Sequence, residues 1–304
     1  GSELCIRDRC RSRTLLEIEF IDIRIKAMYI HINVRRIVMR MMSIASGSSG
    51  NCIYIGTETT HILIDDGISR KRVIEGLTML DIKAEDIDAL LITHEHDDHT
   101  SGLGVLERYC PIPVYGTGMT LAAIENNSKL GKVPEGIFNP IHAGDSFMIG
   151  DVTIKSTSVS HDAADPVAYT FSSGKSKAGI ITDLGVYTDE IVENFKNLDT
   201  VLIESNHDIN MLMTGPYPYV LKQRILGGKG HLSNEDCGRL LNGILGGRTG
   251  SVFLGHLSKE NNFPELAYKT VIDELCASNF DENKIKIAVA SRSNPSEILN
   301  LEVS

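Results

Sequence analysis

The sequence predicts an α/β fold, because short apolar runs alternate with segments of helical periodicity through most of its 304 residues. Most of the apolar runs are rich in β-branched residues and close on Gly, Asp, His or Ser, which is typical of strands that end in turns. The segments between them place apolar residues three or four positions apart, as amphipathic helices do. With no solenoid repeat and no low-complexity linker, the chain is expected to form one large domain over residues 41–304.

The apolar runs and the helical segments locate the individual elements. Strands are expected at residues 51–56, 61–67, 88–94, 112–116, 152–159, 167–173, 177–185, 200–205, 251–256 and 284–290. Helices are expected at residues 69–80, 102–109, 118–127, 189–198, 234–245 and 264–278. Ser69 is a suitable N-cap for the first of these helices. The adjoining Arg70, Lys71 and Arg72 could grip a phosphate backbone, but we favour a solvated first turn.

The first 40 residues differ from the rest in charge and pattern. The chain begins with Gly-Ser, as after removal of a tag, and Met39, Met41 and Met42 are plausible starts, so we expect residues 1–40 to be a non-native or over-long extension. They hold nine Lys and Arg against five Asp and Glu, which leaves 21 against 35 in the remainder, a net charge of −14. Nonspecific DNA affinity comes from Lys and Arg, so a body this acidic must hold any anionic substrate locally.

Composition also limits the protein's surroundings. Charged residues interrupt every long apolar stretch, so no membrane span is expected. The six cysteines include no C-x-x-C pair, which argues against a zinc ribbon or a dense disulfide framework and favours a cytoplasmic location. The sequence points to no protein partner.

Polar residues gather at the carboxyl ends of the expected strands. Rigid strand ends can deliver side chains that are distant in sequence into one crevice, so these residues are expected to converge. They are Asp65, the group from His94 to His99, His161, Asp183, Glu204 and His256.

The densest group is the motif H-x-H-x-D-H, formed by His94, His96, Asp98 and His99. Imidazole and carboxylate are ligands of zinc, manganese and iron. In an extended turn His94 and His96 point to one side, whereas Asp98 and His99 can reach a second position nearby. One loop can therefore serve two metal ions, provided that other strand ends supply further ligands.

With the downstream His161, Asp183 and His256, this motif resembles the metallo-β-lactamase superfamily, and the resemblance covers nearly all of the chain from Met42 onward. It implies an αββα four-layer sandwich, with residues 41–304 as the catalytic domain. It also implies one metal ion on His94, His96 and His161, a second on Asp98, His99 and His256, and Asp183 as a bridge between them.

The resemblance extends to residues that bind no metal. Asp65 matches the superfamily aspartate that orients the ligand loop from behind, and its neighbour Asp66 is the weaker candidate. RNase Z-like members imply that His231 is the general acid and that Glu204 pairs with it, although Glu204 could equally be a structural acid at a strand end. Asp98 counts among the catalytic residues as well as the ligands.

The roles of His231 and His256 could be exchanged, because both follow glycine and precede Leu-Ser. We favour His256 as the ligand, since a regular strand delivers it, whereas His231 follows a glycine-rich loop.

Two loops are candidates for contact with substrate. Ser48 and Asn51 lie in a glycine- and serine-rich turn that could cradle a phosphate, although a tight hairpin is an equally good explanation. Tyr217 precedes Lys222 and Arg224, which pairs a stacking face with phosphate-binding charge. The alternative there is a proline-broken loop that leads into an ordinary helix.

Together, the serine-rich turn and the histidine motif look most like the YycJ/WalJ branch of the superfamily, cytosolic bacterial proteins associated with 5′ to 3′ exonuclease activity on DNA. The resemblance implies a phosphodiesterase with two divalent metal ions, zinc or manganese with iron possible, and DNA as its substrate. Two such ions can activate a bridging water and offset charge on a phosphodiester.

Other activities on the same metals remain open. They are RNA processing, hydrolysis of a small cyclic phosphodiester and, less favoured, hydrolysis of a thioester or lactone. The step of 48 positions from Asp183 to His231 leaves no room for the large inserted domain of β-CASP nucleases.

Overall fold

The computed structural model describes residues 37–278 and 284–302, so the extension expected at residues 1–40 lies outside the described part except for its last four residues. Those four begin β1 (Ile37–Ala45), where Arg40 pairs with Gly56 at the end of β2 (Cys52–Gly56). Residues 38–301 form one compact unit.

Two mixed sheets make up the centre of this unit. The first contains β1 and β2 together with β3 (His61–Ile64), β4 (Ala89–Leu91), β5 (Val114–Thr117), β6 (Phe138–Ile141) and β14 (Leu299–Glu302), in the order β14-β1-β2-β3-β4-β5-β6. The second contains β7 (Ser146–Ile149), β8 (Val152–Ser158), β9 (Val167–Ser173), β10 (Ser176–Ile181), β11 (Thr200–Glu204), β12 (Ser251–Gly255) and β13 (Lys286–Val289), in the order β13-β12-β11-β10-β9-β8-β7.

The two sheets face each other across an apolar core. Side chains alternate along each strand, so Ile62 and Ile64 of β3 point into this core, where Tyr169 and Phe171 of β9 also lie. Leu63, between the two isoleucines, points to the opposite face and packs in a separate cluster with the helices that cover the first sheet.

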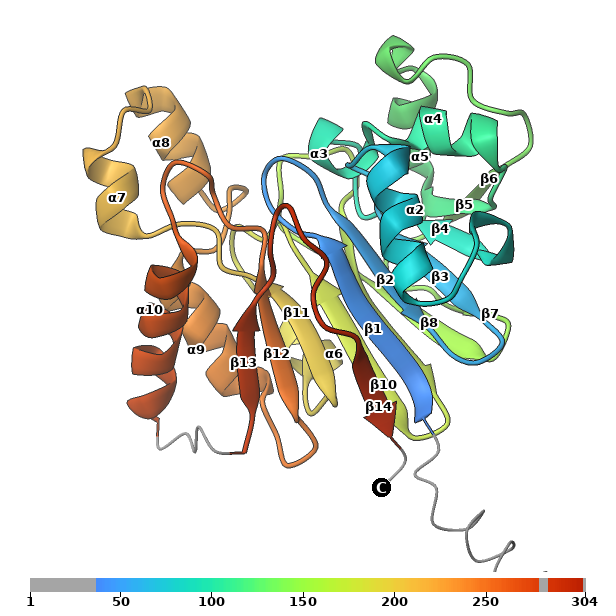
Figure 1. The fold of residues 1–304 in the computed structure, drawn as a ribbon. Coiled ribbons are helices and arrows are strands. Elements are labelled where there is room, and N and C mark those ends of the chain that lie inside the picture. Colours follow the sequence, from blue (N-terminus) through green and yellow to red (C-terminus); the bar gives the residue numbers. More distant parts are fainter. Residues whose placement is uncertain (1–36, 279–283, 303–304) are drawn as a thin grey trace, which may run out of the picture. The chain divides into compact units, whose positions relative to one another are not determined.

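Helices cover the outer face of each sheet (Figure 1). Over the first sheet lie α2 (Arg70–Met79), α4 (Leu103–Tyr109) and α5 (Gly118–Glu125), and over the second lie α6 (Asp189–Phe195), α9 (Asn234–Ile244) and α10 (Pro264–Cys276). Side chains of Thr117, Thr188 and Ser233 cap α5, α6 and α9 by accepting backbone N–H bonds. The predicted αββα four-layer sandwich is therefore confirmed.

All ten expected strands and all six expected helices are present, most of them shorter than predicted. The prediction missed β1, β6, β7 and β14, the short α3 (Asp97–Thr100) and α7 (Ile209–Thr214). The proline-containing segment leads into α8 (Tyr219–Leu226), which buries none of its residues. None of the helices described here is both long and apolar enough to cross a membrane.

Strand direction explains how the expected site residues meet. β3 and β4 run parallel, as do β10, β11 and β12, so within each sheet their carboxyl ends lie at the same edge. β8 is antiparallel to β9, and β9 is antiparallel to β10, which gives β8 the same direction as β10. Residues that follow these strands are therefore delivered to a common edge.

Candidate metal centre and active site

The chain turns sharply where three of these strands end. Asp65, Asp183 and His256 have φ values of 59°, 55° and 54°, and such left-handed backbone costs a non-glycine residue about 1 kcal/mol or more. Hydrogen bonds hold two of the turns: Asp65 N–H donates to Leu91 O at 2.8 Å, and His256 N–H donates to Ser46 Oγ at 2.9 Å. Strained backbone at these positions directs functional side chains to the sheet edge.

Three imidazoles form a first cluster. One ring nitrogen from each of His94, His96 and His161 lies within 4.8 Å of the others. Nε2 of His161 is 3.3 Å from Nδ1 of His96, and two nitrogens bound to one tetrahedral zinc ion are roughly 3.4 Å apart. Nε2 of His94 is buried and has no hydrogen-bond partner. A cation between the three rings would satisfy that nitrogen.

Asp98, His99 and His256 form a second cluster, in which one ligand-type atom from each residue again lies within 4.8 Å of the others. Oδ2 of Asp98 lies 3.1 Å from Nε2 of His256 and 3.5 Å from Nε2 of His99. Asp183 touches both clusters, because its carboxylate oxygens lie 3.1 Å from Nε2 of His99 and 3.7 Å from Nε2 of His161. The structure thus brings together all seven residues that the sequence suggested as metal ligands.

Hydrogen bonds on the outer side of the rings fix which nitrogen is free. Nδ1 of His161 lies 3.0 Å from the carbonyl oxygen of Gly230, and Nδ1 of His99 lies 2.7 Å from Oδ2 of Asp65. A carbonyl or carboxylate oxygen can only accept, so both Nδ1 atoms carry the proton. Each Nε2 then faces the cluster and is the nitrogen that would bind a cation, which is the arrangement of a metal-binding histidine.

The electrostatics of the site also suit a cation. Burial, followed by the neighbouring His99, holds the pKa of His94 well below its usual value, so this ring is neutral. Burial likewise opposes charge on His256, but the carboxylates of Asp183, Asp98 and Glu204 outweigh it and raise the pKa of His256 to about 10. The negative charge of these carboxylates favours a positive charge beside them. In the absence of metal a proton on His256 supplies that charge, and a bound cation would replace it.

Glu204 lies behind both His231 and His256. Its Oε1 is 2.8 Å from Nδ1 of each ring, and its Oε2 accepts N–H bonds from Leu184 and Leu232 at 2.8 and 3.1 Å. The two imidazoles differ in access, because the His231 side chain is 21% exposed and that of His256 is 1% exposed. His256 is thus enclosed among the clustered groups, and His231 can meet a ligand from solvent.

Asn51 and Ser48, both expected to contact substrate, lie in very different environments. Asn51 is fully buried, and its amide donates to the backbone oxygens of Gly47 and Asp98 at 3.2 and 3.3 Å and lies 3.1 Å from Nε2 of His99. Ser48 is exposed at the tip of the turn. Only Ser48 of the pair can meet a ligand without rearrangement.

The basic residues expected beside Tyr217 are occupied by protein contacts. Lys222 Nζ donates to the carbonyl oxygens of Met213 and Gly215 at 2.7 and 2.8 Å, and Arg224 pairs with Asp162. Tyr217 is partly exposed ahead of α8.

Sequence reasoning missed Thr93, which ties the loop together. Its N–H and hydroxyl donate to the Asp65 carboxylate at 2.8 and 2.9 Å, and its Oγ1 lies 3.0 Å from Nδ1 of His94. Its place directly before the histidine motif was an available signal. Asn206, whose amide donates to His256 O at 2.9 Å, gave no such signal.

An αββα sandwich with two adjacent His and Asp clusters at its strand ends is the architecture of a metal-binding protein. A comparison with known protein families leads to the same class. Residues 60–254 match the model of the beta-lactamase superfamily domain. The chain belongs to this superfamily.

Two bacterial relatives indicate which branch of the superfamily the chain belongs to. The chain is 43% identical to exodeoxyribonuclease WalJ of Streptococcus pneumoniae over 236 residues, which cover 78% of this chain and 88% of that protein. It is 38% identical to exodeoxyribonuclease YycJ of Bacillus anthracis over 237 residues, which cover 78% and 89%. These identities place it in the YycJ/WalJ branch.

Among solved structures, the metallo-β-lactamase fold protein YhfI from Bacillus subtilis aligns with a TM-score of 0.61 at 17% identity. The alignment covers 85% of this chain and 99% of that one, and at this identity it supports the fold alone.

Proposed function

We propose that this chain is a dinuclear metal-dependent phosphodiesterase, and specifically a DNA exonuclease that works from the 5′ end. The observation that carries the proposal is the shared carboxylate of Asp183, which touches two adjacent clusters of ligand-type atoms beside the Glu204–His231 pair. The names of the two bacterial relatives, both exodeoxyribonucleases, support DNA as the substrate.

The ligand assignment follows the two clusters. His94, His96 and His161 would hold one ion, Asp98, His99 and His256 would hold the other, and Asp183 lies between the two clusters. The donor set is nitrogen and oxygen without sulfur, which suits zinc or manganese and also accommodates iron. When bound, such a pair of ions supplies an activated water and neutralises charge on the phosphodiester.

The remaining residues have distinct tasks. Glu204 fixes the Nδ1–H tautomer of His231, so that Nε2 of this partly exposed ring can carry a proton to the departing oxygen. Asp65 and Thr93 orient His99 and His94 through their Nδ1 atoms. We assign Asn51 to the same positioning role, since its amide holds the backbone of the metal loop.

The four described cysteines are free thiols. They fit a reducing compartment, and with DNA as the substrate we place the protein in the cytoplasm.

The test is cleavage of 5′-labelled and 3′-labelled DNA, single-stranded and duplex, in manganese, in zinc and with chelator. We expect metal-dependent release of mononucleotides from the 5′ end. Turnover of a small phosphodiester or thioester without any cleavage of DNA would move the substrate to a small molecule and reject the exonuclease.

Three histidine variants separate the proposed roles. His231→Ala is expected to keep two metal equivalents and lose about 10²- to 10⁴-fold in kcat, the usual contribution of a general acid. His256→Ala should lose metal as well as rate. His142→Ala is the matched control, because its side chain is 90% exposed and lies 3.4 Å from Asp145, away from both clusters. Loss of metal from His231→Ala but not from His256→Ala would exchange the two roles.

A further inference from the structure

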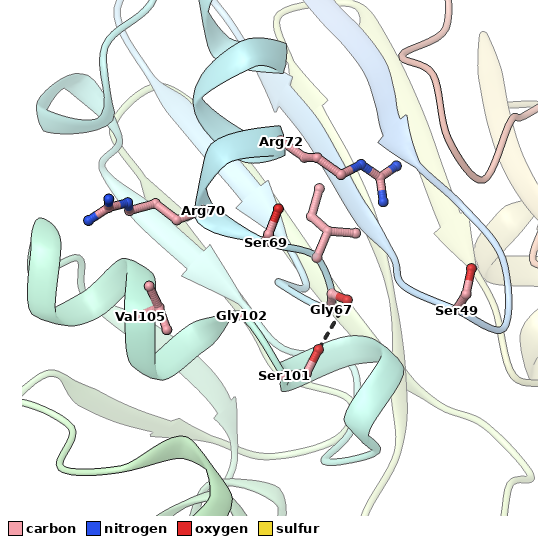
Figure 2. A pocket seen from close by; sticks show the side chains of 9 residues that line it. Ser49, Gly67, Ser69, Arg70, Arg72, Ser101, Gly102 and Val105 are labelled. Atoms are coloured by element: carbon pink, nitrogen blue, oxygen red, sulfur yellow. Dashed lines mark hydrogen bonds between the residues drawn. The ribbon is translucent and has the colours of Figure 1, made fainter.

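A separate, open cavity of about 470 Å³ lies beside the first turn of α2. None of the clustered ligand residues lines it. Its polar lining consists of Arg70 and Arg72 with the hydroxyls of Ser49, Ser69 and Ser101. Figure 2 shows the two arginines leaving the helix on opposite sides, with Ser69 and Ser101 between them.

Both guanidinium groups keep donors for a ligand. Arg70 lies over the ring of Tyr109, with 4.6 Å from Cζ to the ring centroid. Arg72 donates through Nη2 to the carbonyl oxygen of Arg292 at 2.6 Å. Neither forms an ion pair with a carboxylate in the described ranges, and each guanidinium has five donors. Two guanidinium groups therefore line one cavity with their charge unpaired.

The Ser69 hydroxyl adds a donor to this lining. Ser69 makes no capping bond to the helix, so its O–H can donate to an anion, whereas the O–H of Ser101 is already donated to Gly67 O at 3.1 Å. The Asp66 carboxyl lies behind Gly102, where a Cβ would come within 2.6 Å of it. It is fully buried and does not face the cavity.

The cavity shares a wall with the proposed metal loop. Gly67 lines it, and a Cβ on Gly67 would lie 1.7 Å from the backbone oxygen of Asp98. Ser101 directly follows α3, the short helix that carries Asp98 and His99. The cavity and the proposed metal centre are therefore built on neighbouring parts of the same backbone.

We propose that this cavity binds a phosphate group of the same DNA strand whose scissile bond lies at the metal centre. Guanidinium groups bind phosphate through paired hydrogen bonds, and the hydroxyls of Ser49 and Ser69 and the first backbone N–H groups of α2 add neutral donors. The inference rests on the proposed exonuclease function and gives the strand a second point of attachment away from the reacting phosphate.

The test compares Arg70→Gln and Arg72→Gln with Lys71→Gln. Lys71 lies between the two arginines on the same turn, but its side chain is 83% exposed, pairs with Glu75 and does not line the cavity. Each arginine variant is expected to raise KM for a single-stranded DNA substrate about three- to tenfold. Each should also lower the slope of log KM against log salt by about 0.7, the loss of one phosphate contact. Lys71→Gln should change neither.

A second substrate, the reporter thymidine 5′-(4-nitrophenyl phosphate), is too short to reach the cavity. It therefore distinguishes a loss of DNA binding in the cavity from damage to the metal loop. Unchanged kcat/KM on the reporter with impaired DNA turnover supports the cavity. Equal impairment on both substrates, or DNA turnover and salt slope equal to wild type, overturns it. Absence of DNA cleavage by the wild-type enzyme is a different result, because it rejects the exonuclease itself.

DNA with a 5′-phosphate and DNA with a 5′-hydroxyl identify the source of the phosphate. An arginine effect confined to the phosphorylated end assigns the cavity to the terminal phosphate. An equal effect on both substrates assigns it to the internal backbone.

Discussion

Nδ1 of His231 lies 2.8 Å from Oε1 of Glu204. The same oxygen meets Nδ1 of His256 at the same distance, and the carboxylate is fully buried. Burial alone would raise the pKa of Glu204, but the two imidazoles hold it well below its ordinary value. One carboxylate thus orients both the proposed acid and a proposed metal ligand.

Glu204→Gln should impair both of these histidines. Oε2 accepts two backbone N–H bonds and Oε1 faces two Nδ1–H groups, so an amide in either orientation places its NH2 against donors. We expect the free energy of unfolding to fall by about 2–4 kcal/mol and kcat to fall at least 10²-fold. Urea unfolding and turnover of the metal-loaded enzyme measure these changes. Glu193→Gln, an exposed acid beside Lys196, is the control, and wild-type behaviour of Glu204→Gln would contradict the role.

Asp65 and Asp66 are adjacent, yet their substitutions should differ. Asp65 accepts bonds from Thr93 and from Nδ1 of His99, whereas the Asp66 carboxylate oxygens have no hydrogen-bond partner. In Asp65→Asn an NH2 group would face one of these donors, and the bond that orients His99 would be weakened. Metal affinity should therefore fall about 10- to 100-fold. Asp66→Asn should leave metal affinity near wild type. Competition with a chromophoric chelator compares the two, and equal losses would remove the distinction.

The sequence was most informative where chemistry is local. H-x-H-x-D-H lies within six positions, and the apolar runs before Asp183 and His256 identified them as strand-end residues whose side chains could converge. The four-layer sandwich followed from the same motif through family resemblance. Short edge strands such as β6 and β7 were missed because their residues are only partly buried and lack a clean apolar alternation.

Roles set by long-range contacts could not be predicted. Asn51 in its serine-rich turn looks like a ligand for phosphate, and only the approach of the Asp98 backbone shows that its amide is enclosed. The sequence around Arg70 and Arg72 favours a solvated first turn of a helix. Their placement with Ser101, about thirty positions away, depends on packing between α2 and the end of α3.

Glu107 should make stability depend on pH. Burial raises the pKa of this carboxyl on α4 to about 7, against the bond its Oε2 accepts from Ile112 N–H. Its folded-state pKa exceeds its unfolded value, so the folded state binds the proton more tightly. Its contribution is therefore fully present below about pH 4.5 and is lost as pH rises to about 7, by up to about 3 kcal/mol.

Glu107→Gln should remove that dependence, because a neutral amide keeps an acceptor for Ile112 and has no proton to lose. Urea unfolding at pH 5 and pH 8 is compared for both proteins at equal metal loading. Burial and then the Glu107 charge raise the pKa of the nearby Asp66, so the difference between the two proteins reports Glu107 together with its effect on Asp66. Identical pH dependence in wild type and variant would refute the assignment.

Gly67→Ala tests whether the metal loop depends on close backbone packing. The added Cβ would lie 1.7 Å from Asp98 O, and that oxygen cannot retreat freely because it accepts the Asn51 N–H at 2.8 Å. The strain should cost about 3 kcal/mol of unfolding free energy and lower metal affinity, since Asp98 and His99 must move with their backbone.

Gly118→Ala is the control, because nothing lies within 4 Å of its Cβ position at the exposed start of α5. That substitution should be neutral or stabilise by about 0.5 kcal/mol. If Gly67→Ala retained full metal content and the wild-type urea midpoint, the loop would be more adaptable than this packing implies.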